Sequence, residues 1–128
     1  MKREACIEEL LVLGLDDWVH LSEVAWTARS IGGAASPEDV RQLSLQSIRD
    51  LLVRELATFG QVDETGYRPW RSSIEETVGR IDREWALSAE PRLGEGGWIR
   101  LTPAGDAAAR ELLSGRGADP PDAEGQTR

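Results

Sequence analysis

Three side chains near the N-terminus have types that can bind a metal ion. Asp16, His20 and Glu23 are spaced as D-x-x-x-H-x-x-E, so they could converge on one face of a helix. Zinc sites are normally built from several histidine or cysteine ligands, and this chain has one of each. His20 and Glu23 also resemble a capping box, with His20 at the N-cap and Glu23 three residues on. We expect the capping arrangement and no metal site.

Residues that carry out catalysis are scarce. The chain has no second histidine or cysteine to activate a nucleophile, and no pair of carboxylates stands out from ordinary surface acids. Cys6 lies on the apolar side of a predicted helix, which favours a small core residue over a reactive thiol. We therefore expect a protein that is not an enzyme and that uses no cofactor.

Length and composition are typical of one soluble domain. The chain has 128 residues, of which 40% are hydrophobic and 30% charged. No apolar run approaches the ~18 residues that span a bilayer, and the N-terminus lacks the apolar segment of a signal peptide. A single cysteine gives no sign of an oxidising compartment. We expect a cytoplasmic protein that does not bind membranes, and its arginine-rich composition suggests a bacterial source.

The net charge of −8 bears on the choice of partner. Acidic residues outnumber basic ones 23 to 15. Proteins that bind DNA normally carry a basic patch, because neutralising phosphates supplies most of the non-specific affinity. Any DNA-binding surface on this chain would have to be a local basic patch on an otherwise acidic protein.

Hydrophobic periodicity predicts several short elements before residue 44. They are a helix at 2–13, a short strand within 16–21, a helix at 21–30, a loop at 31–36 and an extra helix at 37–43. Ser36 and Pro37 are suited to the cap and first position of that extra helix.

The stretch Ser44–Val62 is predicted to form a helix that leads into a strand at 56–62. Ser44 is suited to cap the helix. Its apolar side carries Leu45, Ile48, Leu51, Leu52 and Leu56. The opposite side carries Gln46, Ser47, Arg49, Asp50 and Arg54.

The second half is predicted to contain two helices and one strand. An irregular loop at 63–73 precedes a helix that Ser72 or Ser73 caps and that ends near Leu87. Its apolar stripe packs on this chain's own core or forms an interface with another protein, and it consists of Ile74, Val78, Ile81 and Trp85. The domain at 1–114 is completed by a turn at 90–97, a strand at 98–101 and a helix at 103–114 that carries Ala107, Ala108, Leu112 and Leu113. We expect 115–128 to be a disordered tail.

Three stretches resemble winged helix-turn-helix regulators of the MarR and PadR type. Trp98–Gly105, WIRLTPAG, is similar to their second wing strand and the helix after it. His20–Ala25 resembles the start of their second helix, and Ile48–Leu52 resembles their recognition helix. The resemblance implies a mainly α fold with a small antiparallel β-sheet (α+β). This chain departs from the family in the extra helix at 37–43 and in a helical insertion between the wing strands, at about 64–96.

The resemblance implies a transcriptional regulator that binds double-stranded DNA as a homodimer. The recognition helix would read the major groove with Gln46, Ser47, Arg49 and Arg54. Wing contacts to phosphate would come from Arg68, Arg71 and Arg100. The alternative is an acidic module that binds a protein partner and not DNA, with Ile74, Val78, Ile81 and Trp85 at its interface. Both functions stay open at this point.

Overall fold

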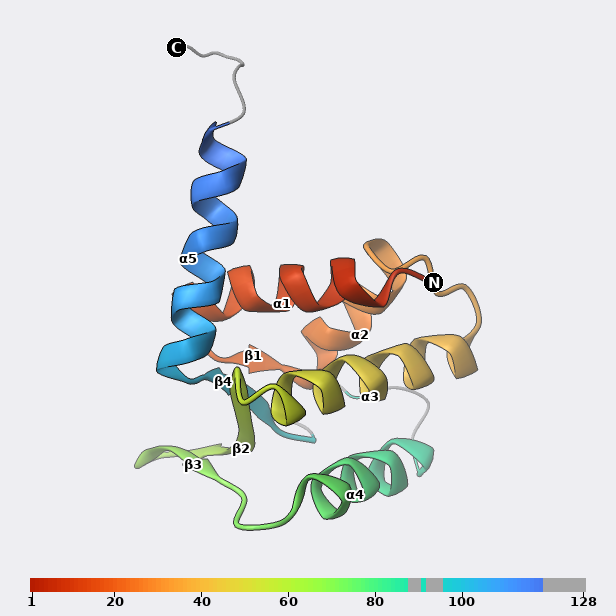
Figure 1. Ribbon diagram of the computed structural model, residues 1–128. Coiled ribbons are helices and arrows are strands. Elements are labelled where there is room, and N and C mark those ends of the chain that lie inside the picture. Colours follow the sequence, from red (N-terminus) through yellow and green to blue (C-terminus); the bar gives the residue numbers. More distant parts are fainter. Residues whose placement is uncertain (88–90, 92–95, 119–128) are drawn as a thin grey trace.

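The computed structural model describes residues 1–87, 91 and 96–118, which form five helices and four strands (Figure 1). The elements are α1 (Arg3–Asp16), β1 (Val19–His20), α2 (Leu21–Ser30), α3 (Pro37–Val53), β2 (Ala57–Asp63), β3 (Gly66–Pro69), α4 (Ile74–Ala86), β4 (Trp98–Leu101) and α5 (Pro103–Ala118). The predicted fold class, mainly helical with a small antiparallel sheet, is confirmed. Most of the predicted turn at 90–97 and the end of the predicted tail, 119–128, lie outside the described residues.

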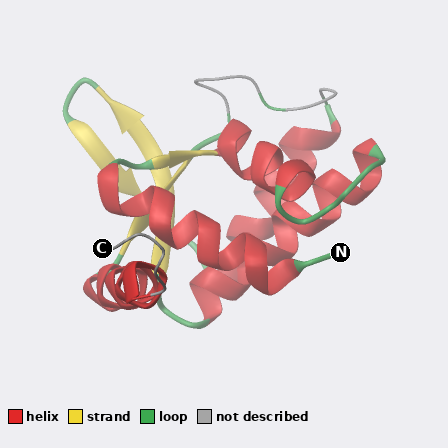
Figure 2. Ribbon diagram, turned by 90° about the horizontal axis from the view of Figure 1, so that it is seen from above, coloured by secondary structure: helices red, strands yellow, loops and turns green. Residues whose placement is uncertain are grey.

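The sheet lies at one end of the molecule, beside the helices, as the view from above shows (Figure 2). Its strand order is β1-β4-β2-β3, and all neighbours are antiparallel. Ile99 of β4 pairs with Val19 on one side and Phe59 on the other. The predicted strands at 56–62 and 98–101 therefore pair directly, although about thirty residues separate them in the sequence.

The prediction of an irregular loop at 63–73 is wrong, because residues 66–69 form the edge strand β3. Asp63 starts a tight turn by accepting hydrogen bonds from the Thr65 backbone N–H (2.8 Å) and hydroxyl (2.6 Å). Gly66 follows with φ +110°, which an L side chain rarely adopts. The strand was missed because it is four residues long and ends in Pro69, a residue tolerated only at a sheet edge.

The predicted break between two helices at Ser44 is also wrong, since α3 is one continuous helix of 17 residues. Ser36 caps it by accepting a hydrogen bond from the Asp39 N–H (3.0 Å), as predicted. Ser44 is fully buried in the middle of the helix. No glycine or proline interrupts the segment after Pro37, and Val40 and Leu43 continue the stripe that later includes Ile48 and Leu51.

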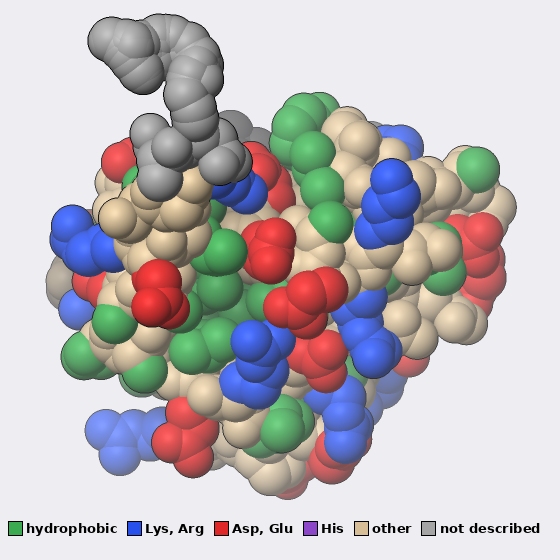
Figure 3. Space-filling model, turned by 45° about the horizontal axis from the view of Figure 1, so that its top comes forward, with side chains coloured by type: hydrophobic (Ala, Val, Ile, Leu, Met, Phe, Trp, Pro, Cys, Tyr) green, Lys and Arg blue, Asp and Glu red, His purple; other side chains and the backbone are tan. Residues whose placement is uncertain are grey.

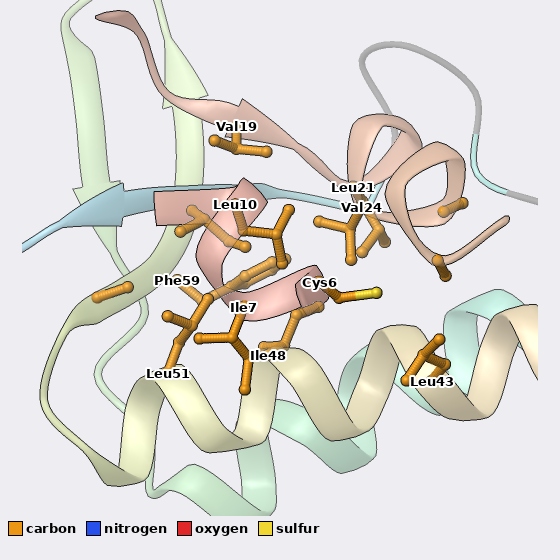
Figure 4. Close-up of a cluster of buried hydrophobic side chains, with 14 of the residues drawn as sticks. Cys6, Ile7, Leu10, Val19, Leu21, Val24, Leu43, Ile48, Leu51 and Phe59 are labelled. Carbon is orange, nitrogen blue, oxygen red and sulfur yellow. The ribbon is translucent and has the colours of Figure 1, made fainter. Parts of the chain in front are cut away.

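The core lies between α1, α2, α3 and the inner face of the sheet (Figure 4). Ile7 and Leu10 of α1 are completely buried, and Phe59 reaches them from β2. Cys6 belongs to this core, and burial raises the pKa of its thiol. This fits the expected structural role of the cysteine. Within the described part of the chain, no helix has the length and apolar character needed to cross a membrane.

His20 caps α2 in the predicted capping box. The Nδ1 of the His20 ring accepts a hydrogen bond from the Ser22 backbone N–H (3.0 Å), and the His20 backbone N–H donates one to Glu23 Oε1 (2.9 Å). The ring is fully buried and lies edge-on to Trp98, with centroids 4.6 Å apart. Among the described residues, no three histidine, cysteine or acidic side chains gather as metal ligands. His20 and Glu23 are thus engaged in structure.

The last helix begins as predicted, but it is longer. Thr102 caps it by accepting a hydrogen bond from the Gly105 N–H (3.1 Å). Ala109 is completely buried, whereas Ala107 and Leu113 are exposed. The helix runs to Ala118, so residues 115–118 of the predicted tail are helical. Gly105 lies so close to the Leu56 backbone that a Cβ would not fit there, and periodicity alone does not reveal this contact.

A capping box starts α4, as predicted, with Ser73 as the cap. The Ser73 hydroxyl accepts a hydrogen bond from the Glu76 N–H (3.1 Å), and the Ser73 N–H donates to Glu76 Oε1 (2.9 Å). The bond from the Ser73 N–H to the carboxylate, followed by a contribution from the Ser73 side chain, holds the pKa of Glu76 below its ordinary value.

We expect the stability of the chain to depend on this cap at acid pH. A carboxylate whose pKa is lower in the folded state stabilises it fully above the unfolded-state pKa, and that stability is lost as the pH falls through the folded-state value. Urea midpoints should therefore decrease below about pH 4.5. Glu76→Gln should make the decrease shallower, whereas Glu64→Gln, in the exposed turn, should not. Equal pH dependence of wild type and Glu76→Gln would contradict the assignment.

Candidate functional site

Helix α4 packs along α3, on the side of α3 away from α1 (Figure 1). The two helices are antiparallel, because Arg49 near the end of α3 bonds to Glu75 at the start of α4 (2.5 Å) and Arg41 bonds to Asp82 further along. The insertion between the two predicted wing strands thus places α4 over part of the α3 surface. The remaining exposed stripe of α3 borders on this helix.

A groove of about 230 Å³ lies between the two helices. It is lined by Arg41, Gln42, Leu45, Gln46 and Asp82. Together with Glu38, Arg49 and Glu75, these residues are called the α3/α4 face below. The groove is smaller than the ~300–1,000 Å³ of typical small-molecule pockets. Its size is suited to one inserted side chain, for which Leu45 offers an apolar wall and the two glutamines offer amide groups.

Carboxylates already bind both arginines of the α3/α4 face. Arg41 contacts Glu38 (2.8 Å) in addition to Asp82, and its hydrogen bonds, followed by one from Gln42, hold the pKa of Glu38 below the ordinary value. Exposed ion pairs of this kind contribute at most about 1 kcal/mol each. Their main effect is on the charge of the surface. The α3/α4 face has three carboxylates and two guanidinium groups, so both arginines are neutralised and the face has a net negative charge.

The residues predicted to read DNA are not all on the exposed side of α3. Gln46 and Arg49 are exposed there, as expected. Ser47 is buried, and its hydroxyl donates a hydrogen bond to the Leu43 carbonyl (2.8 Å), so it cannot touch a groove of DNA without unfolding the helix. Arg54 lies at the C-terminal end of α3 and pairs with Glu4 of α1 (3.6 Å).

Asp50 does not pair with Arg54, its neighbour one helical turn on. It pairs with Arg3 of α1 instead (3.2 Å). Asp50 and Arg54 therefore both form ion pairs with residues of α1, which the spacing within one helix could not reveal.

The predicted wing arginines lie on and after the β2–β3 hairpin and on β4. All three are exposed: Arg68 pairs with Asp63 (2.6 Å), Arg100 lies 5.6 Å from the centre of the Tyr67 ring, and Arg71 follows β3. Arg80 of α4 joins them by stacking on Trp70 at 3.9 Å. This corner of the molecule is more basic than the α3/α4 face.

The predicted interface stripe of α4 faces the interior of this chain. Ile81 and Trp85 are buried in the core, and Ile74 and Val78 are half-buried. Of the two alternatives predicted for the stripe, packing on the chain's own core accounts for Ile81 and Trp85. A partner that binds near α4 would meet its exposed side instead.

Only Gln46 and Arg49 of the α3/α4 face were among the predicted site residues. Arg41 and Gln42 were assigned to a separate helix, and Asp82 was given no role. The signal was present for Gln42, which precedes Gln46 by four residues and shares its face once α3 is continuous.

Searches of protein-family models, curated proteins and solved structures find no match to this chain.

Proposed function

We propose that this chain is a non-catalytic protein-binding module on a winged-helix-type scaffold and that the α3/α4 face receives the partner. One observation carries the proposal: acidic side chains bind both arginines of this face, beside a groove suited to one side chain. If α3 bound the phosphates of DNA, it would need positively charged side chains that are not already paired with carboxylates. The proposal includes action in the cytoplasm, which the lone cysteine supports.

The first experiment measures DNA binding directly. Labelled DNA from upstream of the protein's own gene, and a random duplex of equal length, are titrated with the protein and followed by fluorescence anisotropy. We expect no binding to either at about 50 mM salt, where phosphate contacts are strongest. Tight binding to the upstream DNA that weakens steeply at about 200 mM salt would overturn the proposal.

A matched variant tests the physical reason. Glu75→Gln combined with Asp82→Asn removes the two carboxylates of α4 that pair with Arg49 and Arg41, so both arginines have more free charge. We expect this variant to gain weak, non-specific and salt-sensitive DNA binding. If it gains none, paired charge is not what keeps DNA from α3.

The partner is sought by site-specific photo-crosslinking in the cells that produce the protein. A photoreactive residue at Gln46, in the groove, should give one discrete protein adduct. The same residue at Glu64, in the β2–β3 turn, is the control and should give none. Adducts of equal yield at both positions would argue against a specific α3/α4 face.

DNA binding is kept as the second candidate because of the basic corner formed by Arg68, Arg71, Arg80 and Arg100. These side chains are exposed, and two of them lie beside aromatic rings, Arg80 beside Trp70 and Arg100 beside Tyr67. The anisotropy titration decides between the two candidates. If DNA binds, Arg71→Glu should weaken binding more than Arg49→Glu, because Arg71 is not in an ion pair with any described residue.

A further inference from the structure

A second groove, of about 440 Å³, lies at the basic corner and is called the corner groove below. It is lined by Gln61 of β2, Arg68 and Pro69 of β3, and Trp70 and Arg71, which follow that strand. Figure 1 shows the hairpin of β2 and β3 at the edge of the molecule, where the chain continues to α4. The corner groove shares no lining residue with the α3/α4 groove, so its role goes beyond the function proposed above.

The corner groove has positive charge that is not neutralised. Among the described residues that line it, two are arginines and none is a carboxylate. Arg68 pairs with Asp63 (2.6 Å), whereas Arg71 is in no ion pair with any described residue. The surface around α5 is different, because Figure 3 shows acidic and basic side chains mixed on that face. The unpaired charge of Arg71 therefore makes the corner groove suited to an anionic group.

The polar and apolar walls of the corner groove are fixed by the sheet and by α4. Gln61 and Arg68 lie opposite each other on β2 and β3, so their side chains are on the same face of the sheet. The backbone N–H of Trp70 donates a hydrogen bond to the Phe59 carbonyl (2.9 Å), and the two rings meet edge-on with centroids 4.9 Å apart. Arg80 of α4 stacks on the indole at 3.9 Å. The groove thus has hydrogen-bond donors beside a well-supported aromatic surface.

We propose that the corner groove binds a short acidic segment of a partner protein, in which carboxylate side chains alternate with apolar ones. A carboxylate of the segment binds the guanidinium of Arg71, which can donate two parallel hydrogen bonds to it. A neighbouring apolar side chain lies against Trp70. Clusters of arginine recognise acidic motifs in other proteins by the same chemistry.

The charge of the whole chain favours a short segment over double-stranded DNA as the occupant. A duplex carries one negative charge per ~1.7 Å of its axis, so many of its phosphates would lie outside the groove. Those phosphates would approach a protein whose net charge is −8. A short segment contacts the groove alone and avoids this repulsion.

Fluorescence anisotropy with a labelled peptide tests the proposal. The probe is a peptide of about eight residues in which glutamate and leucine alternate, and the matched peptide has glutamine in place of every glutamate. At about 50 mM salt, where exposed charges are weakly screened, we expect the glutamate peptide to bind at least about tenfold more tightly than the glutamine peptide.

Two variants with the same change of charge locate the binding site. Arg71→Gln should raise the dissociation constant of the glutamate peptide at least about tenfold, because it removes the unpaired guanidinium. Arg110→Gln, on the exposed side of α5, is the control and should leave that constant unchanged. Both positions are exposed, so both variants should melt at the temperature of the wild type.

The proposal would be overturned if the glutamate peptide did not bind, if both peptides bound equally, or if both variants had the same effect. A random DNA duplex that displaces the peptide would also overturn it, because the groove would then take phosphates. These results are separate from those at the α3/α4 face, which crosslinking at Gln46 reports.

Discussion

Gly105→Ala should destabilise the chain by about 3 kcal/mol, an effect at the upper end for one added methyl group. An ideal Cβ at this position would lie 1.9 Å from the Leu56 carbonyl oxygen and 3.0 Å from its carbon. Both atoms belong to backbone, so neither can move aside as a flexible side chain would. The same carbonyl accepts a hydrogen bond from the Thr102 N–H (3.0 Å), and the Thr102 hydroxyl donates to the Glu55 carbonyl (2.7 Å). The added methyl group would therefore separate α5 from the end of α3.

Gly79→Ala is the matched control for this prediction. Gly79 is also inside a helix, but the nearest atom to its added Cβ is the end of the Arg83 side chain at 3.4 Å. Alanine should stabilise α4 there by about 0.5–1 kcal/mol through helix propensity. Both changes are measured by urea unfolding followed by circular dichroism at 222 nm. If Gly105→Ala were neutral or stabilising, the close contact with Leu56 would be wrong.

Trp85→Ala should destabilise the whole chain by about 3–5 kcal/mol, because it removes a large buried side chain. Trp85 is 4% exposed and belongs to the same core as Ile81 and the α3 residues Ile48 and Leu51. The loss should appear in one cooperative unfolding transition that includes α1 to α3. A small domain has only about 5–15 kcal/mol of stability, so part of the variant would be unfolded at 37 °C.

Trp26→Ala is the control, since Trp26 is half exposed on α2. Its effect should stay within about 0.5 kcal/mol. Unfolding in urea, followed by circular dichroism, gives both values. A Trp85→Ala variant as stable as wild type would mean that the tryptophan is available to a partner. Two separate transitions would mean that the segment containing α4 folds independently of the rest.

Local signals in the sequence were sufficient for most helix starts and for the fold class. The caps at His20, Ser36, Ser73 and Thr102 were all predicted, because a cap involves residues two or three positions apart. The apolar stripe of α1 was predicted for the same reason. The false break at Ser44 arose because serine favours caps in isolation, whereas here the core around Leu43 and Ile48 holds one helix together.

The candidate site was predictable only in part. Exposure of Gln46 and Arg49 follows from periodicity within α3. Burial of Ser47 does not, because it depends on where α1, α2 and α4 pack around that helix. The partners of the charged residues, Glu75 for Arg49 and Arg3 for Asp50, come from other helices and have no signal in the local spacing.

The sequence by itself determined most helix starts and their caps, the overall negative charge and the scarcity of catalytic residues, since these depend on composition and near neighbours. Tertiary structure decided the rest. It paired β3 with β2, turned α5 so that Ala109 faces inward and Leu113 outward, and placed α4 against α3. Packing of distant segments determines which arginines meet carboxylates, and so which surface of this acidic chain is open to a partner.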